Sequence, residues 1–159
     1  MQFDRAIRLS WLPALLLTLF AATTIQAQPA DPPAPETVAD RCIERFEGIT
    51  ERTEDRVATV AAKAVEFIET SGANSEVIER VARRNIGAIN KSAASSVRAI
   101  RNTNRRCLGA LRNLDADPAL AEAVHDAALA AIEAIRDARA DAVAQVKDAA
   151  GTDGGANSE

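Results

Sequence analysis

Apolar side chains recur at steps of three and four residues through nearly all of the chain between residues 36 and 150. This spacing is typical of one buried face of an α-helix, and the two-residue alternation of a half-buried strand is missing from the same region. Prolines are absent between Pro35 and Pro118, and alanine, glutamate and arginine dominate the composition there. The pattern therefore predicts an all-α fold.

Two breaks in the apolar pattern divide the region into three helices. The predicted helices cover about residues 36–71, 75–113 and 117–150. At the first break Gly72 provides a left-handed stop, and Asn74 or Ser75 can cap the helix that follows. At the second break Asp117 is a cap, and Pro118 falls in the first turn, where its missing N–H costs nothing.

Each predicted helix has one apolar stripe along its length. The stripe of the first helix consists of Cys42, Phe46, Ile49, Thr53, Val57, Val60, Ala64 and Phe67. The stripe of the second consists of Ile78, Ala82, Ile86, Ile89, Ala93, Val97, Ile100, Asn104, Cys107, Leu111 and Leu114. The stripe of the third consists of Leu120, Val124, Ala128, Ala131, Ile135, Ala142 and Val146. Several steps follow the order four, four, three, which is closer to an eleven-residue than to a seven-residue period, so the helices should be nearly straight.

Long helices joined by short turns favour an elongated antiparallel three-helix bundle with coiled-coil-like packing. Each helix of about 33 residues spans about 50 Å. Aromatic residues are few and alanine fills much of the third stripe, so the core should be narrow. At the start of the first helix, residues 37–40 resemble a capping box with Asp40 in place of the usual glutamate.

Cys42 and Cys107 are the only cysteines, and both fall on apolar stripes. Counted along their helices they lie about 44 Å and 48 Å from the intervening turn, a difference of less than one helical turn. In an oxidising compartment they are therefore expected to form a disulfide at the end of the bundle far from that turn. Closing a loop of about 66 residues contributes about 4 kcal/mol in the chain-entropy model, so the pair reads as structural and not as a redox centre.

Residues 1–27 have the pattern of a secretory signal peptide. Arg5 and Arg8 precede a short apolar run over 11–22, and the small side chain of Ala27 fits a signal-peptidase cut behind it. The run is short for a membrane span, and the alternative is an anchor that stays attached. The sequence thus predicts an exported protein, periplasmic or extracellular, with no transmembrane span after cleavage.

The segments on either side of the predicted bundle differ from it in composition. Residues 28–35 contain four prolines and read as a disordered Pro-rich linker. Residues 151–159 have no apolar side chain larger than alanine and are expected to be a disordered tail. The 36–150 region between them is long enough for one domain and too short for two.

Charge alternates between the three helices. The first and third are net acidic, whereas the second holds nine arginines and lysines against two glutamates. One interpretation is that charges beside the seams select the helix pairing. The other is an exposed face that docks an acidic protein, an anionic polymer or a lipid surface, and its residues are Arg98, Arg101, Arg105 and Arg106. Nucleic acid is a poor partner, because the chain is net acidic and the second helix has no aromatic side chain to stack on bases.

No catalytic pattern stands out. The chain has one histidine, no tyrosine and no glycine-rich phosphate-binding turn, and it lacks the motifs of a haem site, so no cofactor is expected. The one sharp pattern is the Glu-x-x-His step of Glu122 and His125, which resembles half of a di-iron bundle site. A second step would have to come from a dimer, and a boundary histidine near Asp126 is the simpler interpretation.

Polar side chains interrupt the second helix in its middle. Ser96 and Asn104 are expected near the seam, where they would fix the register of the helices. The alternative is a weakly packed midsection, with Gly48 and Gly87 allowing the second helix to loosen and expose apolar surface to a client protein.

These observations favour a non-enzymatic exported helical bundle that acts as a structural or protein-interaction module in the cell envelope. The alternatives are a periplasmic chaperone-like or anionic-ligand-binding protein that uses the basic second helix, and, more remotely, a metal-binding bundle through Glu122 and His125 in a dimer. The partner expected is an unknown envelope protein or an anionic surface. Self-association is also open, because the alanine face of the third helix can pack on a copy of itself.

Overall fold

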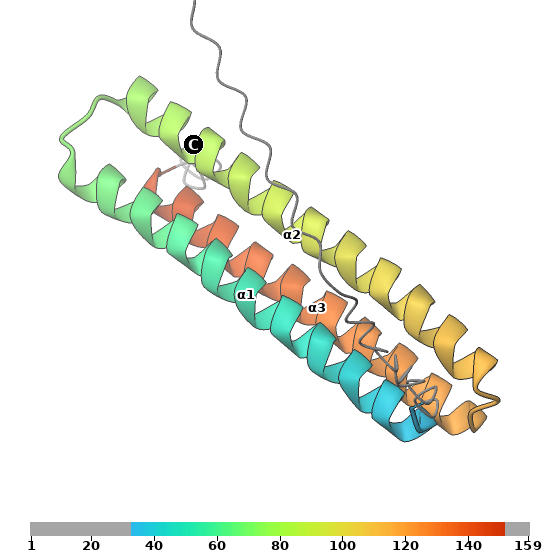
Figure 1. Ribbon diagram of the computed structural model, residues 1–159. Coiled ribbons are helices and arrows are strands. Elements are labelled where there is room, and N and C mark those ends of the chain that lie inside the picture. Colours follow the sequence, from blue (N-terminus) through green and yellow to red (C-terminus); the bar gives the residue numbers. More distant parts are fainter. Residues whose placement is uncertain (1–32, 152–159) are drawn as a thin grey trace, which may run out of the picture. The chain divides into compact units, whose positions relative to one another are not determined.

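A computed structural model describes residues 33–151, and these residues form three helices packed into one bundle (Figure 1). The helices are α1 (Pro35–Thr70), α2 (Ser75–Asn113) and α3 (Pro118–Ala149). Short connections make α2 antiparallel to both of its neighbours, and each helix contacts the other two. The described residues contain no strand, so the prediction of an all-helical bundle is confirmed. The predicted signal peptide, most of the linker and nearly all of the tail lie outside the described residues.

Side chains and backbone conformation at the helix ends explain where each helix begins. Asn74 caps α2 by accepting a hydrogen bond from the Val77 N–H at 3.0 Å, and Gly72 before it has the left-handed φ of 58°. Asp117 caps α3 in the same way, with its Oδ1 2.9 Å from the Ala119 nitrogen. Both caps and the glycine stop agree with the sequence prediction.

The capping box predicted around Asp40 is wrong. Helix α1 already begins at Pro35, and the residue before it, Ala34, makes no side-chain capping bond. A proline ring fixes φ near the helical value and needs no partner for a backbone N–H, so it suits the first position of a helix. Pro35 therefore belongs to α1 and not to the linker.

The deepest side chains of each helix recur every eleven residues, as the predicted period requires. On α1 they are Phe46, Val57 and Ile68, on α2 Ile89, Ile100 and Leu111, and on α3 Val124, Ile135 and Val146. Each is at most 1% exposed except Ile68, at 8%. An eleven-residue repeat has 3.67 residues per turn, close to the 3.6 of a straight α-helix, so the same face stays inside over the whole length.

The predicted stripe of α1 is wrong at its C-terminal end. Ala61 and Ile68 are buried there, whereas Val60 is half-buried and Phe67 is 41% exposed. The predicted steps of three, four, three from Val57 follow a seven-residue period, which drifts around a straight helix. The observed steps of four, three, four keep to the eleven-residue period, and register therefore outweighs the larger apolar area of the phenylalanine.

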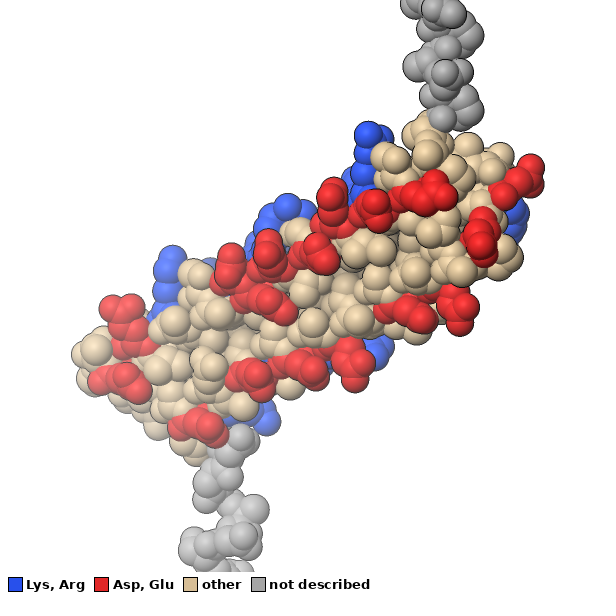
Figure 2. All heavy atoms as spheres, turned by 90° about the horizontal axis from the view of Figure 1, so that it is seen from below, with Lys and Arg blue, Asp and Glu red and all other residues tan. Residues whose placement is uncertain are grey.

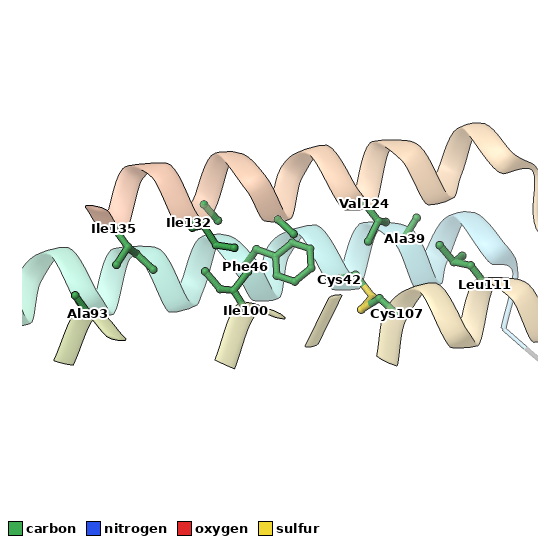
Figure 3. Packing of buried hydrophobic residues seen from close by; sticks show 12 residues of the cluster. Ala39, Cys42, Phe46, Ala93, Ile100, Cys107, Leu111, Val124, Ile132 and Ile135 are labelled. Atoms are coloured by element: carbon green, nitrogen blue, oxygen red, sulfur yellow. A yellow bond between two sulfur atoms is a disulfide. The ribbon is translucent and has the colours of Figure 1, made fainter. Parts of the chain in front are cut away.

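The core consists of two clusters of buried side chains. The disulfide-end cluster, shown in Figure 3, comprises Ala39, Cys42, Phe46, Ala93, Ile100, Cys107, Leu111, Val124, Ala128, Ala131, Ile132 and Ile135. The turn-end cluster comprises Val57, Ala61, Ala64, Ile68, Ala82, Ile89, Ala142 and Val146. Along α1, Thr53 stands between the two clusters, and it is the one buried polar residue in the described part of the chain.

Thr53 is satisfied on both sides. Its Oγ1 lies 2.7 Å from the Ile49 carbonyl oxygen and 2.7 Å from Ser96 Oγ on α2. Because a carbonyl oxygen only accepts, the Thr53 hydroxyl donates its one proton to Ile49 and accepts a hydrogen bond from the Ser96 hydroxyl. Ser96 thus lies on the seam as predicted, and the pair provides a neutral polar contact between α1 and α2 that only one register of the two helices allows.

Mutations can test the finding that Ile68 is buried and Phe67 exposed, opposite to the predicted stripe. We expect Ile68→Ala to lower the free energy of unfolding by about 2–4 kcal/mol, because it leaves a cavity in the turn-end cluster. Phe67→Ala removes a larger but exposed side chain and is expected to change stability by about 0.5 kcal/mol or less. Urea unfolding followed by circular dichroism gives both values, and a greater loss for Phe67→Ala would contradict the observed register.

A double-mutant cycle tests the contact between Thr53 and Ser96. Thr53→Val alone leaves the Ser96 hydroxyl without its partner and is expected to cost about 1 kcal/mol. The double variant Thr53→Val with Ser96→Ala replaces both polar groups by apolar ones and should match or exceed the stability of the natural protein. Additive losses in the urea midpoints would show that the two hydroxyls are not coupled.

Candidate functional site

The predicted disulfide is present. Cys42 on α1 and Cys107 on α2 are bonded, with their Cα atoms 6.3 Å apart and a sequence separation of 65 (Figure 3). Each residue is 7% exposed and belongs to the disulfide-end cluster. Buried sulfur atoms offer little access to an attacking thiolate, and the described part of the chain contains no free cysteine to supply one internally. The bond therefore acts as a structural crosslink between α1 and α2.

The cations of α2 are not neutralised by the acidic helices. Arg80 and Arg83 form ion pairs, at 2.7 Å and 3.5 Å, but their partners Glu76 and Glu79 lie on α2 itself. The other seven arginines and lysines of α2 have no carboxylate within 4 Å among the described residues. The prediction that charges beside the seams pair α2 with its neighbours is thus wrong at the level of direct contacts.

Hydroxyls and amides of α2 take part in the polar contacts between helices, and no carboxylate does among the described residues. Besides Thr53 with Ser96, Asn104 of α2 contacts His125 of α3, and Asn90 of α2 accepts a hydrogen bond from Arg139 of α3. The narrow core favours such contacts. Seam positions are occupied by small side chains, so the short amides and hydroxyls of α2 beside them can be reached from the neighbouring helix.

Opposite charges occupy different sides of the bundle. Figure 2 shows a face on which aspartates and glutamates form rows along the length, with lysines and arginines mostly at its margins. Helices α1 and α3 supply fifteen of the seventeen helical carboxylates, and α2 supplies two. Carboxylates are therefore concentrated on α1 and α3, and α2 is the basic helix of the bundle.

The four arginines predicted to form an anion-binding face differ in their surroundings. Arg98 and Arg101 line a groove between α2 and α3, whereas Arg106 lines a different groove, between α1 and α2 beside the disulfide. Arg105 is exposed and is not a lining residue of either groove. Steps of three and four residues place Arg98, Arg101 and Arg105 on neighbouring turns of one side of α2.

The groove between α2 and α3 contains two further arginines that the sequence analysis missed. The groove, called the arginine groove below, is lined by Asn90, Ala93, Ala94, Val97, Arg98, Arg101, Ile135, Arg136 and Arg139, and no carboxylate lines it. Arg136 and Arg139 were overlooked because α3 is net acidic as a whole. Their three-residue spacing next to the buried Ile135 was the available signal, since it places both on the edge of a seam.

Two of the four guanidinium groups are held by neutral acceptors. Arg139 Nε donates to Asn90 Oδ1 across the groove, and Arg98 Nε donates to the Ala94 carbonyl oxygen at 3.3 Å. Neither bond cancels the positive charge, and each engages only one of the five N–H donors of its arginine. The groove therefore combines cations, partial side-chain fixation and a floor of small apolar residues.

The remote metal alternative rests on Glu122 and His125. Both are exposed on α3, and His125 Nδ1 lies 3.1 Å from Asn104 Nδ2, so in the neutral ring this nitrogen accepts a hydrogen bond from the amide. A metal bound by this histidine would therefore have to use the other ring nitrogen, Nε2. No group of three or more His, Cys, Asp or Glu side chains in residues 33–151 is arranged to hold a metal ion.

Part of the alanine face of α3 is used inside the bundle. Ala127, Ala130, Ala131 and Ala134 line a shallow groove with Phe46 of α1, and Glu47 and Glu51 also line it.

None of the helices in the described part of the chain is long and apolar enough to cross a membrane. Comparison of the sequence and structure with protein-family models, curated proteins and solved structures finds no match.

Removing the disulfide has a predictable cost. We expect the double variant Cys42→Ser and Cys107→Ser to lose about 4 kcal/mol of unfolding free energy relative to the oxidised protein, because its unfolded chain is no longer closed into a loop. Urea unfolding of both proteins, with and without a reducing agent, gives the difference. Reductant should not affect the variant, and equal midpoints for the variant and the oxidised protein would contradict a stabilising role.

Proposed function

We propose that this protein is a non-enzymatic exported helical bundle, and that it acts as an interaction module of the cell envelope by binding an anionic partner through α2. The main supporting observation is that seven of the nine α2 cations have no carboxylate within 4 Å among the described residues. Like charges on one helix repel each other, and among the described residues no direct ion pair with α1 or α3 offsets this repulsion. An external anion would relieve it.

The separation of charge gives the interaction a direction. The acidic face seen in Figure 2 repels an anionic partner, whereas the cations of α2 attract it, so the partner approaches the side of α2. The covalent crosslink between α1 and α2 and the caps of α2 keep this side in a fixed shape. A rigid, one-sided surface suits binding to another molecule better than it suits catalysis, which needs converging reactive groups.

Compartment and chemistry support the same proposal. The signal-peptide pattern of residues 1–27 favours export, and a structural disulfide persists best in an oxidising compartment. The absence of an enzymatic role is inferred from the sequence, which has one histidine, no tyrosine and no nucleophile-and-base pattern.

Charge reversal on α2 tests the proposal. We expect the triple variant Arg98→Glu, Arg101→Glu and Arg105→Glu to lose at least tenfold in partner capture from an envelope extract. The matched control Arg52→Glu, Arg56→Glu and Lys63→Glu makes the same change in net charge with exposed residues of α1. Quantitative mass spectrometry of the captured proteins and polymers at low and high salt gives the readout. Equal losses in both variants, or none in either, would contradict binding through α2.

A further inference from the structure

We propose that the arginine groove binds a linear phosphate-bearing polymer laid along the seam between α2 and α3. This inference rests on the proposed binding of an anion through α2, and it names both the place and the chemical class of the ligand. The residues that carry it are Arg98, Arg101, Arg136 and Arg139, which line one groove from two helices.

The four arginines form a row and not a ring. The contacts of Asn90 with Arg139 and of Asn104 with His125 fix the antiparallel register of α2 and α3. In that register Arg139 lies level with Asn90 and Arg136 level with Ala93, and Arg98 and Arg101 follow further along α2. At 1.5 Å per residue the row is about 16 Å long. One compact anion contacts only neighbouring members of such a row, whereas an extended polymer with repeated charges contacts all four.

Two of the groove arginines, Arg98 and Arg139, are partly fixed by hydrogen bonds before a ligand binds. Asn90 fixes Arg139 and the Ala94 carbonyl fixes Arg98, both through Nε, so the terminal N–H groups stay available. Part of the side-chain entropy that binding an arginine costs is therefore lost already on folding. A carboxylate partner would also have fixed these side chains, but it would have cancelled their charge.

The lining suits a phosphate chain and lacks the stacking groups of a nucleic-acid site. Every cation of the groove is an arginine, whose planar fork matches two oxygens of a phosphate group. Ala93, Ala94, Val97 and Ile135 complete the lining, so no acidic side chain within it repels a phosphate chain. No aromatic side chain lines the groove to stack on bases, which points to a phosphate chain without them.

Titration calorimetry with three probes tests the inference on the full oxidised chain. The probes are long-chain inorganic polyphosphate, pyrophosphate and poly-L-glutamate with the same number of charges as the polyphosphate. We expect polyphosphate to bind at least tenfold more tightly than poly-L-glutamate, and at least tenfold more tightly than pyrophosphate at equal phosphate concentration. Equal affinity for poly-L-glutamate overturns the choice of phosphate but leaves the proposed binding of acidic partners intact.

Variants outside α2 keep this test separate from the previous one. Arg136→Gln with Arg139→Gln should weaken polyphosphate binding at least tenfold and lower its salt dependence, because two phosphate contacts are lost. Arg136→Lys with Arg139→Lys keeps the charge but loses the two-oxygen contact. Its affinity for polyphosphate should lie between those of the natural protein and the glutamine variant. The control Arg41→Gln with Arg45→Gln removes the same charge from the groove beside the disulfide and should bind like the natural protein. Equal weakening in that control, with unchanged circular dichroism in all variants, overturns the arginine groove as the site.

Discussion

Three helices of more than thirty residues stay in contact from end to end only if the same face of each remains inside over some nine turns. In this protein an eleven-residue spacing of large buried side chains, such as Phe46, Val57 and Ile68, meets that requirement with little supercoiling. Much of the remaining buried surface is alanine, which lets the helices approach closely but buries little area per residue. The positions of the caps, the crosslink and the grooves all depend on this narrow, straight core.

The narrow core also determines where charge can act. Seam positions accept alanine, a hydroxyl or an amide, as with Thr53 and Ser96, and they leave long charged side chains outside. The cations of α2 therefore form no ion pairs with the other described helices and are available to other molecules. A basic side on an otherwise acidic protein is then a consequence of thin packing, and the arginine groove is the part of that side to which a second helix adds cations of its own.

Local sequence signals predicted most of the helix ends. Gly72 and Asp117 act through their own backbone or the next turn and were predicted, and Asn74 is one of the two caps that the sequence left open. The capping box around Asp40 was the local signal that failed, because α1 already begins at Pro35. The choice between Phe67 and Ile68 depends on register accumulated over many turns, so local hydrophobicity favoured the wrong residue. The pairing of Arg136 and Arg139 with α2 arginines depends on the rotation of one helix against another. Charge totals for each helix do not contain that information.

The crosslink between Cys42 and Cys107 and the 71–74 connection join α1 and α2 at both ends, whereas α3 is attached only through residues 114–117. Residues 42–107 thus form a covalent ring. A protease that cuts one peptide bond inside this ring opens it but releases no fragment, because the two pieces remain joined through sulfur. A cut in the 114–117 connection instead leaves α3, with Arg136 and Arg139, held to the ring by noncovalent packing alone. Damage to the molecule is therefore unequal: after a single cut the ring stays covalently joined, whereas α3 can dissociate from it.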